Sequence, residues 1–360
     1  MKKQYIIPVF VPYTNEEQNY IFYNSKNQNK KISKENIEQI IENHLKNIDE
    51  KDKTVEVYFV GSSFMYLERN LQEEILKSLN KYIEDKKIDF IRISTTPKYI
   101  NKDILKLLKK YKVDTIEIQI PATNSYVLKN LQNNCSFKEI KKISRQIKWK
   151  NINLSFQIII GLPESTRAET IEIVQKLSKL KPNNVKIYPA LVIKGSRLEK
   201  EFLEEKYKPL NIVQAIELCK DIVSIFVQKN IEIAGIGPQN TEEIPSTEGA
   251  NDVIAGPLHT SFRNLVESSL WYDAIVGKIK KLNVKVEEVE ITVNPIDANN
   301  ALGFENENVK KLKDVYDVDL KVIQDEKIKQ GKSKVEVTKT YQDFWQKEVK
   351  EENKIENFNK

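Results

Sequence analysis

The chain has 360 residues, of which 40% are hydrophobic and 31% charged, and its 58 Lys and Arg against 52 Asp and Glu leave a net charge of +6. A chain of this length buries a large core, and one large domain with a smaller addition is the natural division. No run approaches the ~18 apolar residues that cross a bilayer, no secretory signal is recognisable, and two cysteines are too few for a disulfide framework, so we expect a cytoplasmic protein rather than a membrane or disulfide-rich secreted one.

Apolar, β-branched runs alternate with helical periodicity along the first part of the chain. We expect strands at residues 5–11, 55–60, 90–94, 115–120, 153–160 and 185–192. Helices are expected between them at residues 34–45, 71–83, 104–111, 137–147 and 166–180. Short strands that are apolar on both faces indicate parallel pairing through crossover helices. The pattern therefore predicts six βα units in a parallel α/β fold.

A helix at 212–229 and a strand at 231–236 follow, and then the composition changes. Residues 237–252 contain two Pro, two Gly and many polar residues, which indicates a loop. The segments expected beyond it are a helix at 258–279 and parts of a small α/β appendage at 286–293, 306–316 and 318–322. The expected divisions are a main domain at 1–237, an appendage at 238–340 and a charged tail at 341–360.

The segment that says most about function runs from residue 6 to residue 24 and reads IIPVFVPYTNEEQNYIFYN. It resembles the cluster loop of radical S-adenosylmethionine (SAM) enzymes, in the bacterial branch related to the Elongator catalytic subunit, where a strand and a Pro precede Cys-x3-Cys-x2-Cys. When this segment is aligned with that loop, the three cysteine positions correspond to Glu16, Tyr20 and Tyr23. Thiolates hold iron–sulfur clusters because soft sulfur matches the iron, whereas carboxylate and phenol oxygens are hard donors. The resemblance therefore implies a degenerate member that has lost its cluster.

Further segments agree with the same family in order and spacing. They include residues 55–65, 91–99, 156–163, 185–195 and 253–267. The resemblance covers roughly residues 5–325 and implies a six-unit partial (β/α) barrel of the radical SAM type with a small C-terminal α/β appendage. It also implies vestigial contacts to S-adenosylmethionine, at Gly61, Ser62, Ser63, Ser94 and Gly161. Gly161 fits a plain strand-to-helix turn equally well.

Lysines surround the altered loop, and aromatic residues precede them. The lysines are Lys26, Lys30, Lys31 and Lys34. Single-stranded RNA is bound by such a combination, because lysines meet phosphates and bases stack on aromatic rings, although a solvated loop is the plainer alternative. The resembling enzymes act on transfer RNA, so RNA, with tRNA as its first candidate, is the first expected partner and a protein is the second. A second lysine cluster at 106–112 is expected to be an exposed helix face.

Three hypotheses for function remain. The favoured one is a pseudoenzyme without a cluster, a non-catalytic binding or regulatory protein in which S-adenosylmethionine is not expected either. The second is a radical SAM enzyme with unconventional ligands, and the third is a repurposed barrel enzyme that uses Glu16, Glu117 or His259. Cys135 has no expected base beside it and Cys219 is expected in the core, so neither predicts nucleophilic catalysis or a zinc site.

Overall fold

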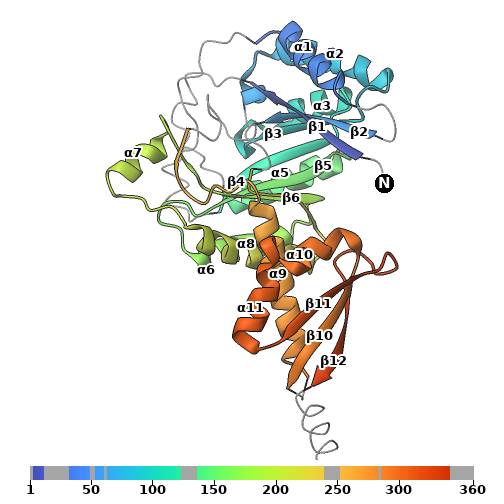
Figure 1. Ribbon diagram of the computed structural model, residues 1–360. Coiled ribbons are helices and arrows are strands. Elements are labelled where there is room, and N and C mark those ends of the chain that lie inside the picture. The colour runs from blue at the N-terminus through green and yellow to red at the C-terminus, as the bar shows by residue number, and fades with distance from the viewer. Residues whose placement is uncertain are drawn as a thin grey trace, which may run out of the picture. The chain divides into compact units, whose positions relative to one another are not determined.

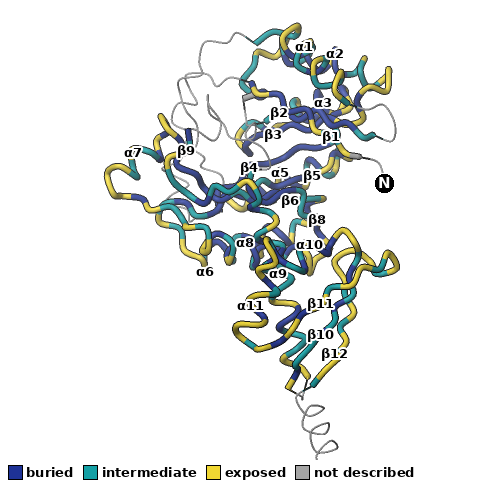
Figure 2. Tube along the Cα trace, in the orientation of Figure 1, coloured by how far each residue is buried: buried dark blue, intermediate teal, exposed yellow. Residues whose placement is uncertain are grey.

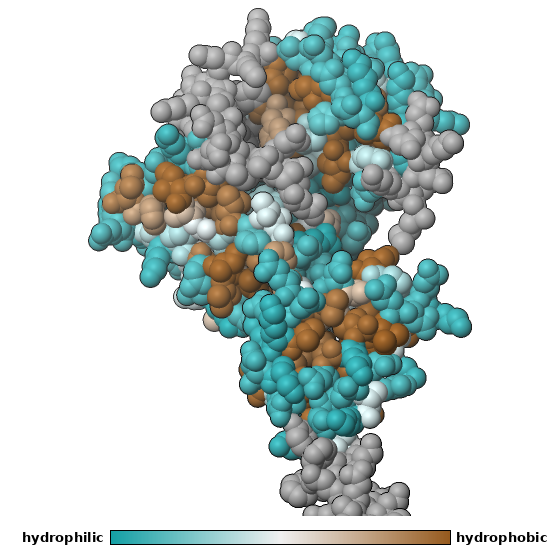
Figure 3. All heavy atoms as spheres, viewed as in Figure 1, coloured by the Kyte–Doolittle hydropathy of each residue, from teal (hydrophilic) through white to brown (hydrophobic). Residues whose placement is uncertain are grey.

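The computed structural model describes part of the chain and divides it into two compact units. The described residues are 3–11, 32–48, 53–60, 63–122, 136–238, 252–282 and 285–340. The first unit is Met1–Thr260 and the second is Ser261–Lys360. Among the helices that the structure describes, none is long and apolar enough to cross a membrane. On the face shown in Figure 3, hydrophilic residues surround separate hydrophobic patches.

The first unit is built on a seven-stranded sheet whose strands follow one another in chain order (Figure 1). The strands are β1 (Lys3–Phe10), β2 (Lys53–Val60), β3 (Phe90–Thr95), β4 (Thr115–Pro121), β5 (Asn153–Ile160), β6 (Asn184–Pro189) and β8 (Glu232–Ile236). Every neighbouring pair is parallel. The sheet curls into a partial barrel, which confirms the predicted fold class.

The crossover helices, apart from α2, begin where the sequence supplies capping side chains. They are α1 (Lys34–Leu45), α2 (Arg69–Glu84), α3 (Lys102–Lys110), α5 (Phe137–Trp149), α6 (Arg167–Ser178), α7 (Arg197–Leu203) and α8 (Ile212–Val227). Ser33, Ser136, Thr166 and Asn211 each form a capping box with the residue three positions later. Such a box satisfies free N–H groups of the first turn, which explains why the predicted helix starts agree closely with the observed ones.

The predicted strand at 185–192 is divided in the structure. β6 ends at Pro189, and residues Val192–Ile193 form a separate strand, β7, that pairs antiparallel with β9 (Val253–Ala255). Proline lacks the N–H that would continue the ladder. Because β9 pairs with β7, the first unit extends to Thr260, beyond the boundary expected at residue 237.

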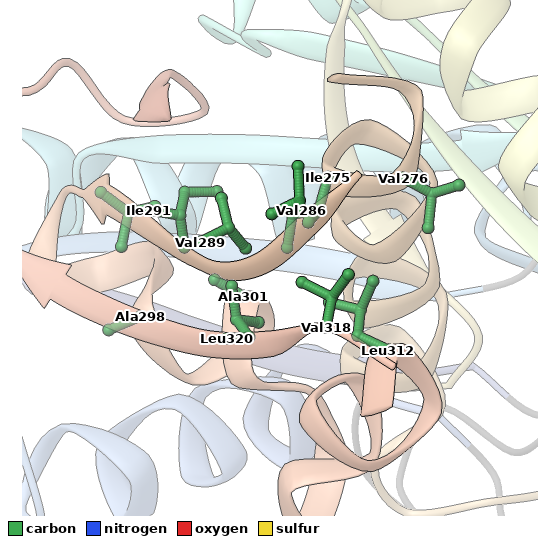
Figure 4. Packing of buried hydrophobic residues seen from close by; sticks show 11 residues of the cluster. Ile275, Val276, Val286, Val289, Ile291, Ala298, Ala301, Leu312, Val318 and Leu320 are labelled. Carbon is green, nitrogen blue, oxygen red and sulfur yellow. The ribbon is translucent and has the colours of Figure 1, made fainter. Parts of the chain in front are cut away.

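In its described residues, the second unit packs three helices on a small mixed sheet. Its elements are α9 (Phe262–Ile279), β10 (Val286–Val293), α10 (Ala298–Leu302), α11 (Glu307–Tyr316), β11 (Asp319–Gln324) and β12 (Ser333–Thr340). β10 is the central strand, parallel to β11 and antiparallel to β12. Its core, shown in Figure 4, is formed by apolar residues that include Ile275, Val289, Ile291 and Leu312. The expected α/β appendage is therefore present, with β12 as an additional strand.

Candidate functional site

The parallel sheet separates apolar and polar side chains onto its two faces. On β2, Val55, Val57 and Phe59 are buried on one face, while Glu56 and Tyr58 lie on the other, as the two-residue period of a strand requires. Figure 2 shows that the strands of the parallel sheet are buried along most of their length. We call the face that carries the polar residues the inner face. Its polar residues include Glu56, Tyr58, Arg92, Ser94, Thr115, Glu117, Gln119, Ser155, Gln157, Asn184 and Lys186.

Arg92 lies at the centre of a buried network on this face. Its Nε is 3.1 Å from Glu56 Oε1, and its Nη1 is 3.1 Å from Glu117 Oε2. The same Nη1 also donates to Ser155 Oγ at 3.3 Å and to Asn184 Oδ1 at 3.2 Å. One guanidinium thereby connects β2, β3, β4, β5 and β6, because its planar fork has five N–H donors.

Glu117 is the second centre of the network and is 0% exposed. Its Oε1 accepts a short hydrogen bond, 2.5 Å, from the Tyr58 hydroxyl, and its Oε2 lies 3.7 Å from Lys186 Nζ. Lys186 Nζ also lies 3.9 Å from the centroid of the Tyr58 ring, within range of a cation–π interaction. Two carboxylates, Glu56 and Glu117, therefore face two cations, Arg92 and Lys186.

The charges in this network fix the protonation of Glu117. Burial alone would raise the pKa of its carboxyl group, but Lys186 and Arg92 outweigh burial and hold the pKa below its ordinary value. Burial, together with the charge of Glu117, raises the pKa of Tyr58 well above that of a free phenol, so Tyr58 remains a donor. A general acid or base works best with a pKa near the working pH. Glu117 therefore stays a carboxylate at neutral pH, where it supports the sheet and is poorly suited to proton transfer.

This pKa shift makes stability depend on acidity. The pKa of Glu117 in the folded protein lies below 4.5, its ordinary value, so its contribution is fully present above about pH 4.5 and is lost as the pH falls through the lower folded value. We expect the guanidinium midpoint of unfolding to fall between about pH 5 and pH 3. Glu117→Gln should be less stable than the wild type at pH 7 and lose less over the same interval. Equal losses in the two proteins would assign the acid sensitivity to other groups.

Three buried polar atoms on or beside this network have no hydrogen-bond partner among the described residues. They are Ser94 Oγ, Gln157 Oε1 and Lys186 Nζ. Gln157 and Lys186 are register partners on β5 and β6, and Ser94 is the register partner of Glu117. Buried polar groups are normally satisfied, by protein atoms, water or a ligand. The inner face thus offers a cation, a hydroxyl and a carbonyl oxygen to a polar molecule, and Ser94 is one of the residues predicted to contact S-adenosylmethionine.

The other predicted S-adenosylmethionine contacts have different outcomes. Gly61 and Ser62 lie outside the described residues, as does the side chain of Ser63. Gly161 follows β5 with φ +72°, and a Cβ there would lie 2.7 Å from Leu210 Cδ1. Its carbonyl oxygen accepts a 2.6 Å hydrogen bond from the Tyr207 hydroxyl. The turn and its packing are sufficient to explain this glycine.

The predicted cluster loop falls outside the described residues. This concerns Glu16, Tyr20, Tyr23, Lys26, Lys30 and Lys31, and also Cys135 further along. Lys34 is described; it begins α1 and its Nζ lies 3.8 Å from Glu38. Those positions therefore remain predictions from the sequence.

Two other predicted candidates are structural. Cys219 is fully buried in α8, and burial raises the pKa of its thiol, so it is expected to be unreactive. The lysines of the 106–112 cluster have partners within the chain: Lys106 pairs with Asp103, Lys112 pairs with Glu84, and Lys109 donates to the Asn151 carbonyl oxygen. His259 is half-buried and lies beyond β9.

Sequence reasoning missed most of the network. Of its members only Glu117 was considered as a functional residue. One pattern in the sequence indicates the network: polar residues occupy alternate positions of otherwise apolar strands. Examples are Val-Glu-Val-Tyr on β2, Ile-Arg-Ile-Ser on β3 and Val-Lys-Ile-Tyr on β6. This alternation places the polar groups on one face without showing which of them touch.

The donor set of the chain does not fit an iron–sulfur cluster. Its only cysteines are Cys135 and Cys219, and the stretch from residue 6 to residue 24 has none. Clusters of this kind are held by several thiolates together. In the part of the chain that the structure describes, no group of three or more His, Cys, Asp or Glu could hold a metal ion.

Family models and curated relatives match this chain in part. The Radical SAM superfamily matches residues 18–177, and the Radical SAM C-terminal domain matches residues 182–272. An uncharacterised protein of Methanocaldococcus jannaschii is 27% identical over 194 residues, which are 53% of this chain and 58% of that protein. A tRNA uridine(34) acetyltransferase of Methanocaldococcus infernus is 26% identical over 140 residues, which are 37% of this chain and 26% of that protein. The chain thus spans less than two thirds of the length of either relative.

A solved structure supports the architecture. The archaeal Methanocaldococcus infernus Elp3 with an N-terminal deletion superimposes with a TM-score of 0.56 at 20% identity, over 77% of this chain and 64% of that chain. This likeness concerns the fold, and it agrees with the parallel partial barrel expected from the sequence. The two family models match successive segments, the first within the strands and helices of the sheet and the second from β6 into α9. The chain therefore belongs to the radical SAM superfamily.

Proposed function

We propose that this chain is a member of the radical SAM superfamily without an iron–sulfur cluster, and that it acts as a non-catalytic RNA-binding protein with tRNA as the first candidate ligand. One observation carries the proposal. The segment 18–177 that matches the superfamily contains a single cysteine, Cys135, where cluster ligation takes several thiolates.

The side chains at the expected ligand positions support the same conclusion. Glu16, Tyr20 and Tyr23 supply a carboxylate and two phenols, and phenols with a pKa near ~10 are mostly protonated at neutral pH. Two aromatic rings in place of thiolates are also bulky enough to fill the space that a lost cluster would leave empty. The inner face does not replace the missing chemistry, because Glu117 is held as a carboxylate by Arg92 and Lys186.

The proposal that the chain binds RNA rests on the names of two curated relatives. Two of the matching proteins are named tRNA uridine(34) acetyltransferases, one from each of two Methanocaldococcus species, and each match covers 37% of this chain. Basic residues near the altered loop add attraction for phosphate. Binding of a tRNA transcript at low salt tests this part, and no binding there would remove RNA from the proposal.

Anaerobic reconstitution with iron and sulfide tests the loss of the cluster. We expect a colourless protein with almost no iron per chain and no S-adenosylmethionine cleavage under a strong reductant, because the chain lacks the soft donors. The matched variant carries Glu16→Cys, Tyr20→Cys and Tyr23→Cys and should gain iron and visible absorbance. A control with Lys26→Cys, Lys30→Cys and Lys34→Cys adds the same number of thiols at other positions and should not. A stoichiometric cluster in the unaltered protein would contradict the proposal and restore the enzyme hypothesis.

A further inference from the structure

Helix α5 carries four exposed cations that form no ion pair with a carboxylate among the described residues, although one of them, Lys142, interacts electrostatically with Glu139. They are Lys138, Lys141, Lys142 and Arg145. The helix has one acidic residue, Glu139, and that carboxylate is engaged at the N-terminus, where it accepts hydrogen bonds from the backbone and hydroxyl of Ser136. Ion pairs within a helix occur elsewhere in the chain: Lys176 lies 2.6 Å from Glu172 in α6, and Lys311 lies 2.9 Å from Glu307 in α11.

These four cations lie three and four residues apart, so they form one stripe along the helix. Like charges at this spacing repel and destabilise a helix. Among the described residues Glu139 offsets part of this repulsion at Lys142, and a further negatively charged partner would relieve the rest. The positive charge of this stripe therefore makes it suited to binding an anionic partner.

An aromatic side chain continues the stripe. Trp149 is the last residue of α5, four residues beyond Arg145, and it is 83% exposed. Lys150 Nζ lies 5.7 Å from the centroid of its ring. An indole exposed to this extent makes little packing contact within its own chain. Nucleobases stack on such rings whatever their sequence, and cations beside them hold the phosphates.

The other side of α5 is closed to partners. Ile140, Ile143 and Ile147 are buried. A helix that lies in a membrane surface, or in a protein groove, uses its apolar face, and here that face is already packed. What remains available is a row of cations that ends in one aromatic ring. From Lys138 to Trp149 the stripe is about 16 Å long, enough for a short run of phosphates of a single strand.

We propose that this stripe of α5 binds single-stranded RNA, with its four cations on successive phosphates and a base stacked on Trp149. The proposal rests on the proposed function, because it takes RNA as the partner. It adds the surface that makes the contact, on an element separate from the lysines near the predicted cluster loop.

Fluorescence anisotropy with the whole chain and a labelled single-stranded RNA of about 15 nucleotides tests this surface. The variant carries Lys138→Gln, Lys141→Gln, Lys142→Gln and Arg145→Gln, because Gln keeps the helix propensity. The matched control carries Lys311→Gln, Lys313→Gln, Lys321→Gln and Lys339→Gln, which removes four cations that each have a carboxylate partner. Circular dichroism and the thermal midpoint show whether each variant is folded.

We expect the α5 variant to lower the slope of log affinity against log salt by about 3, since each phosphate contact to a single strand contributes about 0.7. Trp149→Ala should weaken binding roughly 5- to 100-fold. The control variant should keep the slope of the unaltered protein. Equal binding by the α5 variant and the control would overturn the α5 surface and leave the proposed function standing. No RNA binding by the unaltered protein would overturn both, and α5-dependent binding to phosphatidylserine vesicles but not RNA would assign the stripe to a membrane surface.

Discussion

Replacing Arg92 by Met should lower the free energy of unfolding of the parallel-sheet unit by about 3–5 kcal/mol, because it leaves two buried carboxylates without their shared partner. Glu56 and Glu117 each accept from this guanidinium at 3.1 Å, and Ser155 and Asn184 lose a donor at the same time. Guanidinium unfolding at pH 7, combined with hydrogen exchange of the β3 and β4 amides, measures the loss in this unit.

An exposed arginine provides the matched control for Arg92. Arg167 Nε donates to Asp221 Oδ2 at 2.7 Å, but both side chains are open to solvent. Arg167→Met makes the same chemical change and should cost no more than about 1 kcal/mol. Comparable effects of the two substitutions would show that the inner-face network contributes no more than a surface pair. Arg92→Lys should recover only part of the loss, because one ammonium cannot reach both carboxylates in the same geometry.

Gly303→Ala should destabilise the second unit by about 3 kcal/mol. Gly303 joins α10 to the following turn with φ +85° and ψ 159°, a conformation that is essentially restricted to glycine. A Cβ at this position would lie 2.6 Å from the backbone nitrogen of Asn308, an atom that cannot rotate away. The side-chain amide of Asn308 is buried and its Nδ2 donates to the carbonyl oxygens of Ser268, Asn300 and Ala301. Moving Asn308 therefore disturbs three hydrogen bonds.

Two other glycines of the same unit separate the causes of this loss. Gly331 also has a positive φ, +72°, but nothing lies within 4 Å of its Cβ position, so Gly331→Ala should cost only about 1 kcal/mol. Gly277 is inside α9 with open space around it, and Gly277→Ala should stabilise by about 0.5–1 kcal/mol. Hydrogen exchange in α9 and β10 reports on this unit. If Gly303→Ala cost no more than Gly331→Ala, the close approach to Asn308 would not matter.

Regular elements of this chain were predictable because local signals agree with the tertiary structure. Lys34–Leu45 and Asn153–Ile160 have the bounds expected from capping residues and apolar runs. β12 was missed because Ser333–Thr340 alternates charged residues with only two half-buried valines, Val335 and Val337. β7 and β9 are two and three residues long, and their pairing joins parts of the chain that no local pattern connects.

The site was predictable only in part, for a different reason. The sequence alone shows that cysteines are lacking at the expected ligand positions, because the residue types present can be read directly from it. The inner-face network depends on register: Arg92 reaches Asn184, 92 residues later, only because three parallel ladders align the strands from β3 to β6. Alternation shows that Arg92, Glu117 and Lys186 share a face, but the distances among them come from the sheet.

The span of this network has a consequence for synthesis on the ribosome. A nascent chain that has emerged only through β5 contains Glu56, Arg92 and Glu117, so two carboxylates share one cation until Lys186 of β6 arrives. Burying that excess negative charge is unfavourable. The first five strands are therefore expected to remain loosely associated while translation continues. Emergence of β6 then balances the interior and lets the sheet close as one cooperative step, late in the production of the first unit.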